Sequence, residues 1–331
     1  TISQSYTNTI VLGDSEVGGF VGFSDAAILD CYSSGTCTSA GNLGGFSGLL
    51  NSGNVQNCYT SCALAGTGNK GGFTQRINSA TISGCFWDKE LSGITLSSGG
   101  VGKTTAEMRL QLTFVSESWD FVGETTNGSN DYWTMISAVN NGYPCLMWQL
   151  AEPSVSTQTV SDVTSTTATL KGNIVSLGVP NPTQYGFVWG QASSPTLELS
   201  SKTEQGEASS VAEYSYSVSG LTPNTKYYVR SYATNALGTV YGNEQTFTTP
   251  AIVLTIGGNF SCNSKTYDGT ANASISSNNL VLQGVNSSFA VVSLSNLVVS
   301  FTSVSAGDNV PVNINSAEIS GVDADKYILS L

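Results

Sequence analysis

Hydrophobic and polar positions in residues 1–90 follow a repeat of about 27 residues. One mark of each repeat is the triplet Gly-Gly-Phe, and a second mark is Cys followed by an aromatic residue. The stretches between the marks are short and flanked by Asn, Ser and Gly, which favours brief strands and turns over helices. The triplets are Gly18-Gly19-Phe20, Gly44-Gly45-Phe46 and Gly71-Gly72-Phe73, and the pairs are Cys31-Tyr32, Cys58-Tyr59 and Cys85-Phe86.

A repeat of this length cannot bury its own apolar face, so it must stack on its neighbours, as in a β-solenoid. Stacking places equivalent residues about 4.8 Å apart. We therefore expect internal ladders made of the Phe positions and of the Cys-Tyr positions. The glycines are expected at corners that need a positive φ or a close backbone approach.

The order of these marks resembles the GLUG-type repeat of bacterial surface proteins, where a Gly-Gly-aromatic mark is followed by a strand and a Cys-Tyr pair. The resemblance covers residues 1–150 and includes the later segments Trp119-Asp120-Phe121 and Gly142-Tyr143-Pro144. It implies a β-solenoid and brings no catalytic residues.

An aromatic-rich segment, residues 113–150, follows the repeats. Since repeat arrays need caps, we expect this segment to close the open end of the solenoid. A ring-stacking sugar site that includes Trp119 is the alternative. Residues 104–112 predict a helix, with Thr104 or Thr105 as its cap and Glu107 in the first turn.

Residues 151–250 show a different pattern, with alternating strands and turns rich in Thr, Ser and Gly. The stretch 220–230 resembles the corner between the fifth and sixth strands of fibronectin type III domains, where a Tyr hydroxyl ties the corner to the backbone. This resemblance implies a seven-stranded β-sandwich. Its core is expected to include Trp189, Leu221 and Tyr227.

Residues 251–331 resemble the YDG (MBG-like) repeat domain of bacterial adhesins. The resemblance rests on Lys265-Thr266-Tyr267-Asp268-Gly269-Thr270 and on the closing stretch 321–329. It implies a small all-β module, and in that family at least one further strand normally follows. The sheet is then short of one edge strand, and an open edge of this kind invites pairing with another chain.

Composition narrows the chemistry that this chain can perform. It has no histidine, which excludes a Ser-His-Asp triad, a Cys-His pair and a histidine-bearing zinc site. The net charge is −12 and no segment is basic, so we expect no nucleic acid partner. No apolar run is long enough to span a membrane. No cofactor or metal is expected.

The cysteines fall into two groups. Cys31, Cys58 and Cys85 share one phase of the repeat and are expected to form a column of buried small hydrophobic side chains. Cys37 and Cys62 lie beyond their marks and can meet across adjacent coils, so they form a candidate disulfide.

Candidate catalytic groups are few. Asp88 with Glu90, and Asp120 with Glu124 or Asp131, are carboxylate pairs of the type that a glycosidase needs, but such pairs arise by chance in an acidic chain. The stretch 98–105 is similar to a phosphate-binding loop. It lacks the first glycine of that motif and the surrounding βαβ unit, so we expect no nucleotide binding.

The sequence therefore predicts three all-β modules without an enzymatic site. We expect an extracellular or cell-surface structural and adhesive protein, part of a bacterial adhesin or extracellular filament. It is expected to self-associate, through strand pairing at the C-terminal module among other contacts. The alternative function is a carbohydrate- or surface-binding module on a stalk, with surface glycans as partners.

Overall fold

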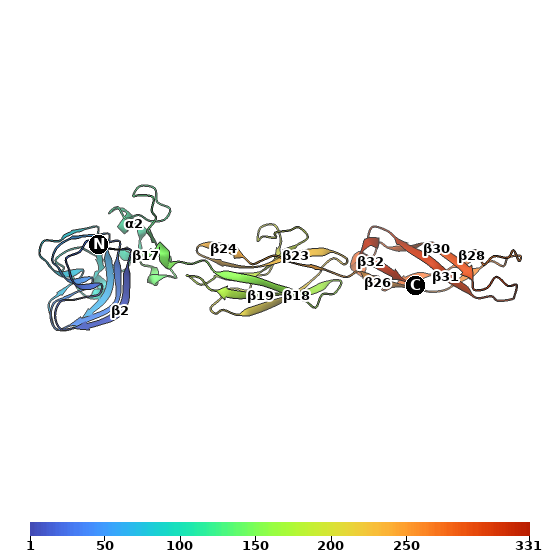
Figure 1. The fold of residues 1–331 in the computed structure, drawn as a ribbon, viewed down its shortest axis with the longest axis horizontal. Helices are drawn as coiled ribbons and strands as arrows, with labels where there is room; N and C mark the ends of the chain where they lie inside the picture. Colours follow the sequence, from blue (N-terminus) through green and yellow to red (C-terminus); the bar gives the residue numbers. More distant parts are fainter. The chain divides into compact units, whose positions relative to one another are not determined.

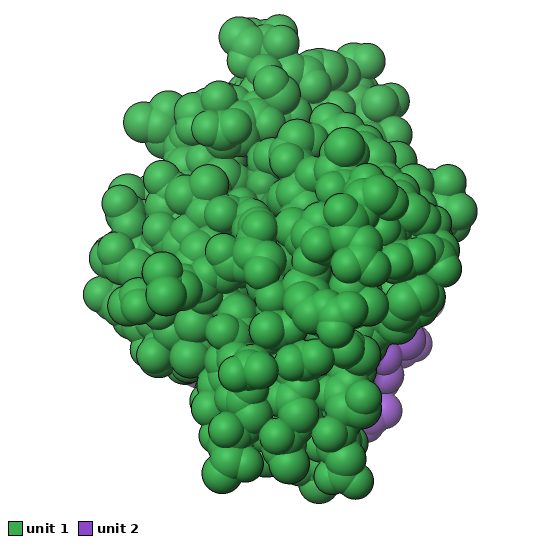
Figure 2. Space-filling view, turned by 90° about the vertical axis from the view of Figure 1, so that its left-hand side faces the viewer, with its two compact units in different colours: residues 1–151 green, residues 152–331 purple.

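The structure, a computed structural model, describes residues 1–331 and consists almost entirely of β-strands. It divides into two compact units, Thr1–Ala151 and Glu152–Leu331. Figure 1 shows the strands of each unit, and Figure 2 shows one side of the first unit as a closely packed surface. No helix in residues 1–331 is long and apolar enough to cross a membrane.

Unit 1 begins with coils whose strands recur at the same positions, and every pairing between coils is parallel. The first coil contains β1 (Ile2–Ser3), β2 (Tyr6–Gly13), β3 (Val17–Gly18) and β4 (Val21–Ser24). The second contains β5 (Ile28–Leu29), β6 (Tyr32–Ser39), β7 (Leu43–Gly44) and β8 (Ser47–Leu50). The third contains β9 (Asn54–Gln56), β10 (Tyr59–Ala65), β11 (Lys70–Gly71) and β12 (Thr74–Ile77). A fourth coil adds β13 (Thr81–Ser83), β14 (Phe86–Asp88) and helix α1 (Lys89–Ser92). β15 (Val101–Lys103) then pairs with β14 as the fifth strand of that sheet. The β-solenoid predicted from the repeat is confirmed.

The strand register stacks equivalent aromatic residues on one another. Phe46 lies between Phe20 and Phe73, with ring centroids 4.8 and 4.7 Å apart and nearly parallel planes. A second column starts with Tyr6 and Tyr32, whose centroids are 5.2 Å apart. These distances match the spacing between neighbouring strands, so each of the first three coils adds one ring to each column.

The repeated glycines lie where the backbone of the next strand approaches closely. A Cβ atom on Gly44 would lie 1.8 Å from the carbonyl oxygen of Ser47. Since no side chain tolerates such an overlap, this phase of the repeat requires glycine.

Residues 104–150, which we call the flank segment, lie along the side of the solenoid rather than over an open end. The segment contains a 3₁₀ turn (Glu107–Arg109), α2 (Gln111–Val115), β16 (Trp133–Thr134) and β17 (Cys145–Leu146). Its hydrogen bonds reach all four coils: Trp148 to Gln4, Trp133 to Asp30, Pro144 to Tyr59, and Trp119 to Gly84. The column of Tyr and Phe side chains is apolar and faces outward from the solenoid, so it has to be covered along its length.

The helix predicted over residues 104–112 is wrong in its extent. Thr104 and Glu107 exchange the hydrogen bonds of a capping box, but only the short 3₁₀ turn follows. Leu110 has an extended backbone (φ −115°, ψ 119°), and α2 begins after it.

The first part of unit 2 is a sandwich of two antiparallel sheets. One sheet has the order β18-β19-β22, and the other has the order β21-β20-β23-β24 with β25 also paired to β23. The strands are β18 (Ser154–Ser161), β19 (Thr167–Ser176), β20 (Gln184–Gly190), β21 (Ser201–Lys202), β22 (Glu213–Ser219), β23 (Lys226–Asn235), β24 (Gly238–Tyr241) and β25 (Gln245–Thr248). Leu170, Phe187 and Val229 are fully buried in its core.

The last part of unit 2 contains three small sheets, of which the largest has the order β29-β26-β32. The strands are β26 (Ile252–Gly257), β27 (Phe260–Cys262), β28 (Ile275–Asn278), β29 (Val281–Gln283), β30 (Ser293–Phe301), β31 (Val312–Ser320) and β32 (Tyr327–Ser330). The final strand β32 pairs in parallel with β26 and has no strand on its other side.

Candidate functional site

The cysteines of the Cys-Tyr marks form a buried column inside the solenoid. Cys31, Cys58 and Cys85 are at most 2% exposed, and each thiol donates to the carbonyl oxygen two residues before it. Burial raises the pKa of the Cys58 thiol well above its ordinary value. A thiol held neutral in an apolar column is a packing group and a poor nucleophile.

Cys37 and Cys62 are buried side by side in a separate cluster with Val17 and Leu43. Both are free thiols in the structure, and both lie against Gly19. A hydrogen bond from the Cys37 thiol lowers the pKa of Cys62 to about 7, while the same contact and burial raise the pKa of Cys37. The disulfide between them stays a prediction.

The aromatic side chains around Trp119 in the flank segment are buried and are not available for stacking on a sugar, whereas Trp148 is exposed. Trp119 is fully buried, and its ring lies 4.5 Å from that of Trp133. Both rings belong to the core cluster that covers Tyr32, Tyr59 and Phe86. The sugar site considered around Trp119 is therefore wrong, because its rings are used for packing against the solenoid.

The carboxylates considered for acid–base catalysis have structural partners. Asp88 is buried, and it accepts hydrogen bonds from the backbone of Glu90 and Leu91 and from the hydroxyls of Thr105 and Tyr143. It thereby caps α1 and fixes the flank segment to the fourth coil.

The second carboxylate pair also lies in turns of the flank segment. Asp120 accepts from the backbone of Asn130, and Glu124 accepts from Thr126 and Asn127. No group of three or more His, Cys, Asp or Glu side chains arranged to hold a metal ion occurs in residues 1–331.

The stretch that is similar to a phosphate-binding loop forms part of the solenoid. Lys103 ends β15, which pairs in parallel with β14, so the lysine belongs to a strand. A phosphate-binding loop needs consecutive free backbone N–H groups before a helix, and this arrangement differs from it.

The first coil is the outermost one in residues 1–331. Its strands β1, β2, β3 and β4 are each the terminal strand of their sheet within these residues. Ile10 and Leu12 on β2 are 74% and 75% exposed, and Phe23 on β4 is 51% exposed. Large apolar side chains are therefore exposed on two strands of this coil.

A hydrogen-bonded row of polar side chains ends at the same coil. Asn78 donates to Asn51, and Asn51 donates to Asp25, at 2.7 and 2.6 Å between the amide nitrogen and the oxygen. A carboxylate only accepts hydrogen bonds, so the row ends at Asp25 with acceptors and no donor.

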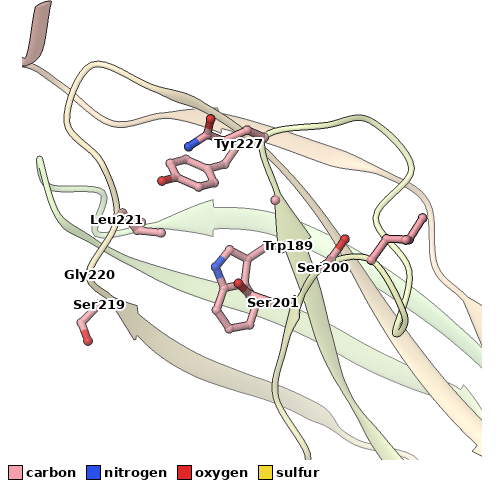
Figure 3. A pocket seen from close by; sticks show the side chains of 10 residues that line it. Trp189, Ser200, Ser201, Ser219, Gly220, Leu221 and Tyr227 are labelled. Carbon is pink, nitrogen blue, oxygen red and sulfur yellow. The ribbon is translucent and has the colours of Figure 1, made fainter.

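In the sandwich, Tyr227 and Leu221 are buried and Trp189 packs against the core from its edge. The hydroxyl of Tyr227 accepts a hydrogen bond of 2.9 Å from the backbone N–H of Thr222, which is the tie of a tyrosine corner. Beside these three residues lies a pocket of about 410 Å³, which Figure 3 shows from close by.

The last module has an exposed strand and a hydrogen-bonded turn. Its terminal strand β32 carries the exposed Ile328. In the turn, Lys265 donates hydrogen bonds to Asp268 and Thr270. The Lys265 contact lowers the pKa of Asp268 to about 2. Asp268 is thus committed to its turn, and β32 is the terminal strand of its sheet within residues 1–331.

Comparison with known proteins finds likeness to parts of the chain. The family described as the YDG domain matches residues 249–331, and a search among curated proteins found no similar sequence. The sensor domain of the anti-sigma factor RsgI4 in Pseudobacteroides cellulosolvens is similar at 19% identity, with a TM-score of 0.25, over 30% of this chain and 96% of that chain. The FN3 domain of human collagen XX is similar at 21% identity, with a TM-score of 0.23, over 30% of this chain and 92% of that chain. The sixth fibronectin type III domain of human fibronectin type III domain containing protein 3 is similar at 23% identity, with a TM-score of 0.22, over 30% of this chain and 88% of that chain.

Proposed function

We propose that this chain is a non-enzymatic structural and adhesive protein of the bacterial cell surface or extracellular space. Its solenoid is of the GLUG type, and it acts in an adhesin or an extracellular filament by spacing its modules and by self-association. The observation that carries the proposal is the regular β-solenoid, whose strand β2 bears the exposed apolar side chains of Ile10 and Leu12.

The partner that fits this coil is the first coil of a second copy. β2 is the longest strand of this coil, and it ends its sheet within residues 1–331. Around a two-fold axis that passes beside β2, the β2 strands of two copies pair antiparallel, and Ile10 and Leu12 lie next to this contact.

The free edge of β32 is a second surface for strand pairing, as the sequence predicts for the C-terminal module. Its backbone groups can bind an added strand, and the exposed Ile328 gives that strand an apolar neighbour. Two such surfaces on one chain allow assembly beyond a dimer.

Substitution on the edge strand tests the proposal. Lysines at Ile10 and Leu12 place charges beside the open edge of β2, where they block strand pairing, and both sites are exposed enough to keep the fold. In sedimentation velocity over a range of concentrations, the wild-type chain is expected to form dimers or larger species. The variant Ile10→Lys with Leu12→Lys is expected to sediment as a monomer.

A matched control is Leu110→Lys with Leu112→Lys in the flank segment. These two leucines are exposed at 58% and 76%, so the control makes the same change of charge away from the first coil. It is expected to associate as the wild-type chain does. A wild-type chain that stays monomeric at every concentration, or a control that dissociates equally, contradicts the proposal.

A further inference from the structure

The pocket at the end of the sandwich is lined by aromatic and uncharged polar groups. Trp189 lies near the end of β20. The other walls of the pocket come from β21 and from the turn between β22 and β23. Figure 3 shows the indole ring of Trp189 in the middle of the pocket, with Leu221 and Ser219 on one side and Ser200 on the other. The lining residues are Trp189, Gly190, Gln191, Leu199, Ser200, Ser201, Ser219, Gly220, Leu221 and Tyr227.

The polar groups of this pocket have no partner within the protein. The indole N–H of Trp189 donates no hydrogen bond in the structure, and it is not among the buried polar atoms that lack a partner, so it reaches solvent. The hydroxyls of Ser200, Ser201 and Ser219 and the amide of Gln191 make no side-chain hydrogen bonds either. One indole donor, three hydroxyls and one amide are therefore free to bind a ligand.

The chemistry of the lining selects among ligands. None of the lining residues is charged, so an ionic ligand would lose hydration without gaining a countercharge. An aromatic ring beside several hydroxyl groups suits a molecule with apolar C–H faces and many hydroxyls. The volume of about 410 Å³ lies within the usual range for small-molecule sites.

We propose that this pocket binds a neutral sugar, with a pyranose ring against Trp189 and the sugar hydroxyls hydrogen-bonded to the indole N–H, the serines and Gln191. The site belongs to the sandwich alone. It does not depend on self-association of the solenoid, and either proposal can fail while the other holds.

Nuclear magnetic resonance of the full chain, labelled with ¹⁵N, gives a direct test. The chain has five tryptophans and hence five indole N–H signals, and the signal missing from Trp189→Phe belongs to Trp189. Methyl β-D-glucoside, methyl β-D-galactoside and cellobiose are the probes. At least one of them is expected to shift the Trp189 signal in a saturable way and to leave the signal of the exposed Trp148 unchanged.

Substitutions in the pocket distinguish specific sugar binding from non-specific contact with the protein surface. Trp189→Phe keeps a ring for packing and removes the N–H donor, so the affinity for the bound sugar is expected to fall about tenfold. The double variant Ser201→Ala with Ser219→Ala changes two exposed residues and is expected to weaken binding by a similar factor without affecting the fold. Trp148→Phe is the matched control and is expected to bind as the wild-type chain does.

A charged probe tests the class of ligand. Glucuronate has the same ring with a carboxylate and is expected to bind at least tenfold more weakly than the glucoside. The proposal is overturned if no neutral sugar shifts the Trp189 signal up to its solubility limit. It is also overturned if both pocket variants bind as the wild-type chain does, or if glucuronate binds as well as the neutral sugars.

Discussion

Three residues of one repeat phase share a left-handed backbone conformation. Asp30, Asn57 and Gly84 have φ values of 53°, 53° and 57°, and each immediately precedes a cysteine of the buried column. Asn and Gly adopt this conformation readily, and Asp does so because its short polar side chain can hydrogen-bond locally. The position therefore accepts different side chains as long as they allow this backbone conformation. In the second coil the residue is Asp30, whose carboxylate is partly buried.

That carboxylate makes the stability of unit 1 depend on pH. Burial raises the pKa of Asp30, hydrogen bonds from Trp133 and Asn57 oppose the rise, and the charge of Asp120 adds to it. A raised pKa means that the folded state binds the proton more tightly than the unfolded state. The favourable contribution is therefore complete below the ordinary value of 3.8 and is lost as the pH rises through the folded-state pKa.

Asp30→Asn copies the residue of the next coil and removes this charge. The variant is expected to be more stable than the wild-type chain at pH 7 by up to about 1 kcal/mol, a figure kept small because the site is partly exposed. The gain is expected to shrink as the pH is lowered toward about 4. Urea denaturation followed by tryptophan fluorescence measures it, since four of the five tryptophans lie in unit 1. Asp25→Asn removes an equal but exposed charge, and an equal gain there would contradict this account.

The Cys37 and Cys62 pair is expected to oxidise before the other buried cysteines. The two sulfurs lie in one buried cluster, and the contact with Cys37 lowers the pKa of Cys62, which favours its thiolate. With hydrogen peroxide, a small oxidant, the Cys62 thiolate is oxidised to a sulfenic acid, and the Cys37 thiol then attacks this sulfur to form the disulfide and release water. Peptide mapping without reduction is expected to show this link, while Cys145, whose pKa burial raises to about 11, stays free.

The choice of protease matters for this measurement. No Lys or Arg precedes Lys70, so trypsin leaves both cysteines in one peptide. Chymotrypsin cleaves at aromatic residues and leucines between them and separates the two. Recovery of Cys37 and Cys62 as unlinked, alkylated peptides after oxidation would show that their sulfurs do not reach each other.

At the scale of an element, Gly44 in β7 is one of the positions where the backbone of the solenoid approaches most closely. Gly44→Ala is expected to destabilise unit 1 by about 3 kcal/mol, because the added Cβ overlaps the Ser47 carbonyl and the turn between β7 and β8 has to open. Gly307→Ala is the control, since its Cβ would lie 3.6 Å from the nearest atom. Urea denaturation of both variants checks the difference, and similar stabilities would disprove the steric explanation.

At the scale of the elements, most of the solenoid could be predicted from the sequence repeat. Gly-Gly-Phe and Cys-aromatic marks at a constant spacing predict stacked coils, because the same residue in each coil meets its equivalent. The course of the flank segment is not encoded in that way. Tyr32 contacts Gln149 and Tyr59 contacts Pro144, and pairs so distant in sequence leave no local pattern.

The break in the predicted helix has a similar cause. Thr104 and Glu107 form the local capping interaction that the sequence indicates. Leu110 is nevertheless extended, and this allows Met108 and Phe114 on either side of it to enter the aromatic core over the solenoid. Tertiary packing therefore decided the course of the backbone against its local preference. The sandwich pocket was equally hidden from the sequence, which indicated Trp189, Leu221 and Tyr227 only as core residues.

For the whole molecule, differences in residue pattern along the sequence indicated separate β-modules. The division into residues 1–150, 151–250 and 251–331 stays a prediction. The structure divides into two compact units, and the boundary between them falls between Ala151 and Glu152. Net charge is the other property of this scale. At −12 and with a pI near 4.2, two copies repel each other at neutral pH.

Self-association through the first coil is therefore expected to strengthen as the pH falls from 7 to about 5. Protonation of carboxylates lowers the net negative charge over this range, while the apolar and backbone groups of the open edges do not titrate. Sedimentation velocity at fixed protein concentration, repeated at decreasing pH, measures this change in association.

General precipitation near the pI would affect every variant alike, so the comparison between variants is decisive. Leu110→Lys with Leu112→Lys should follow the wild-type chain, whereas Ile10→Lys with Leu12→Lys, which has the same net charge, should remain monomeric. Equal association of the two variants at every pH would show that charge alone, and not the first coil, brings the chains together.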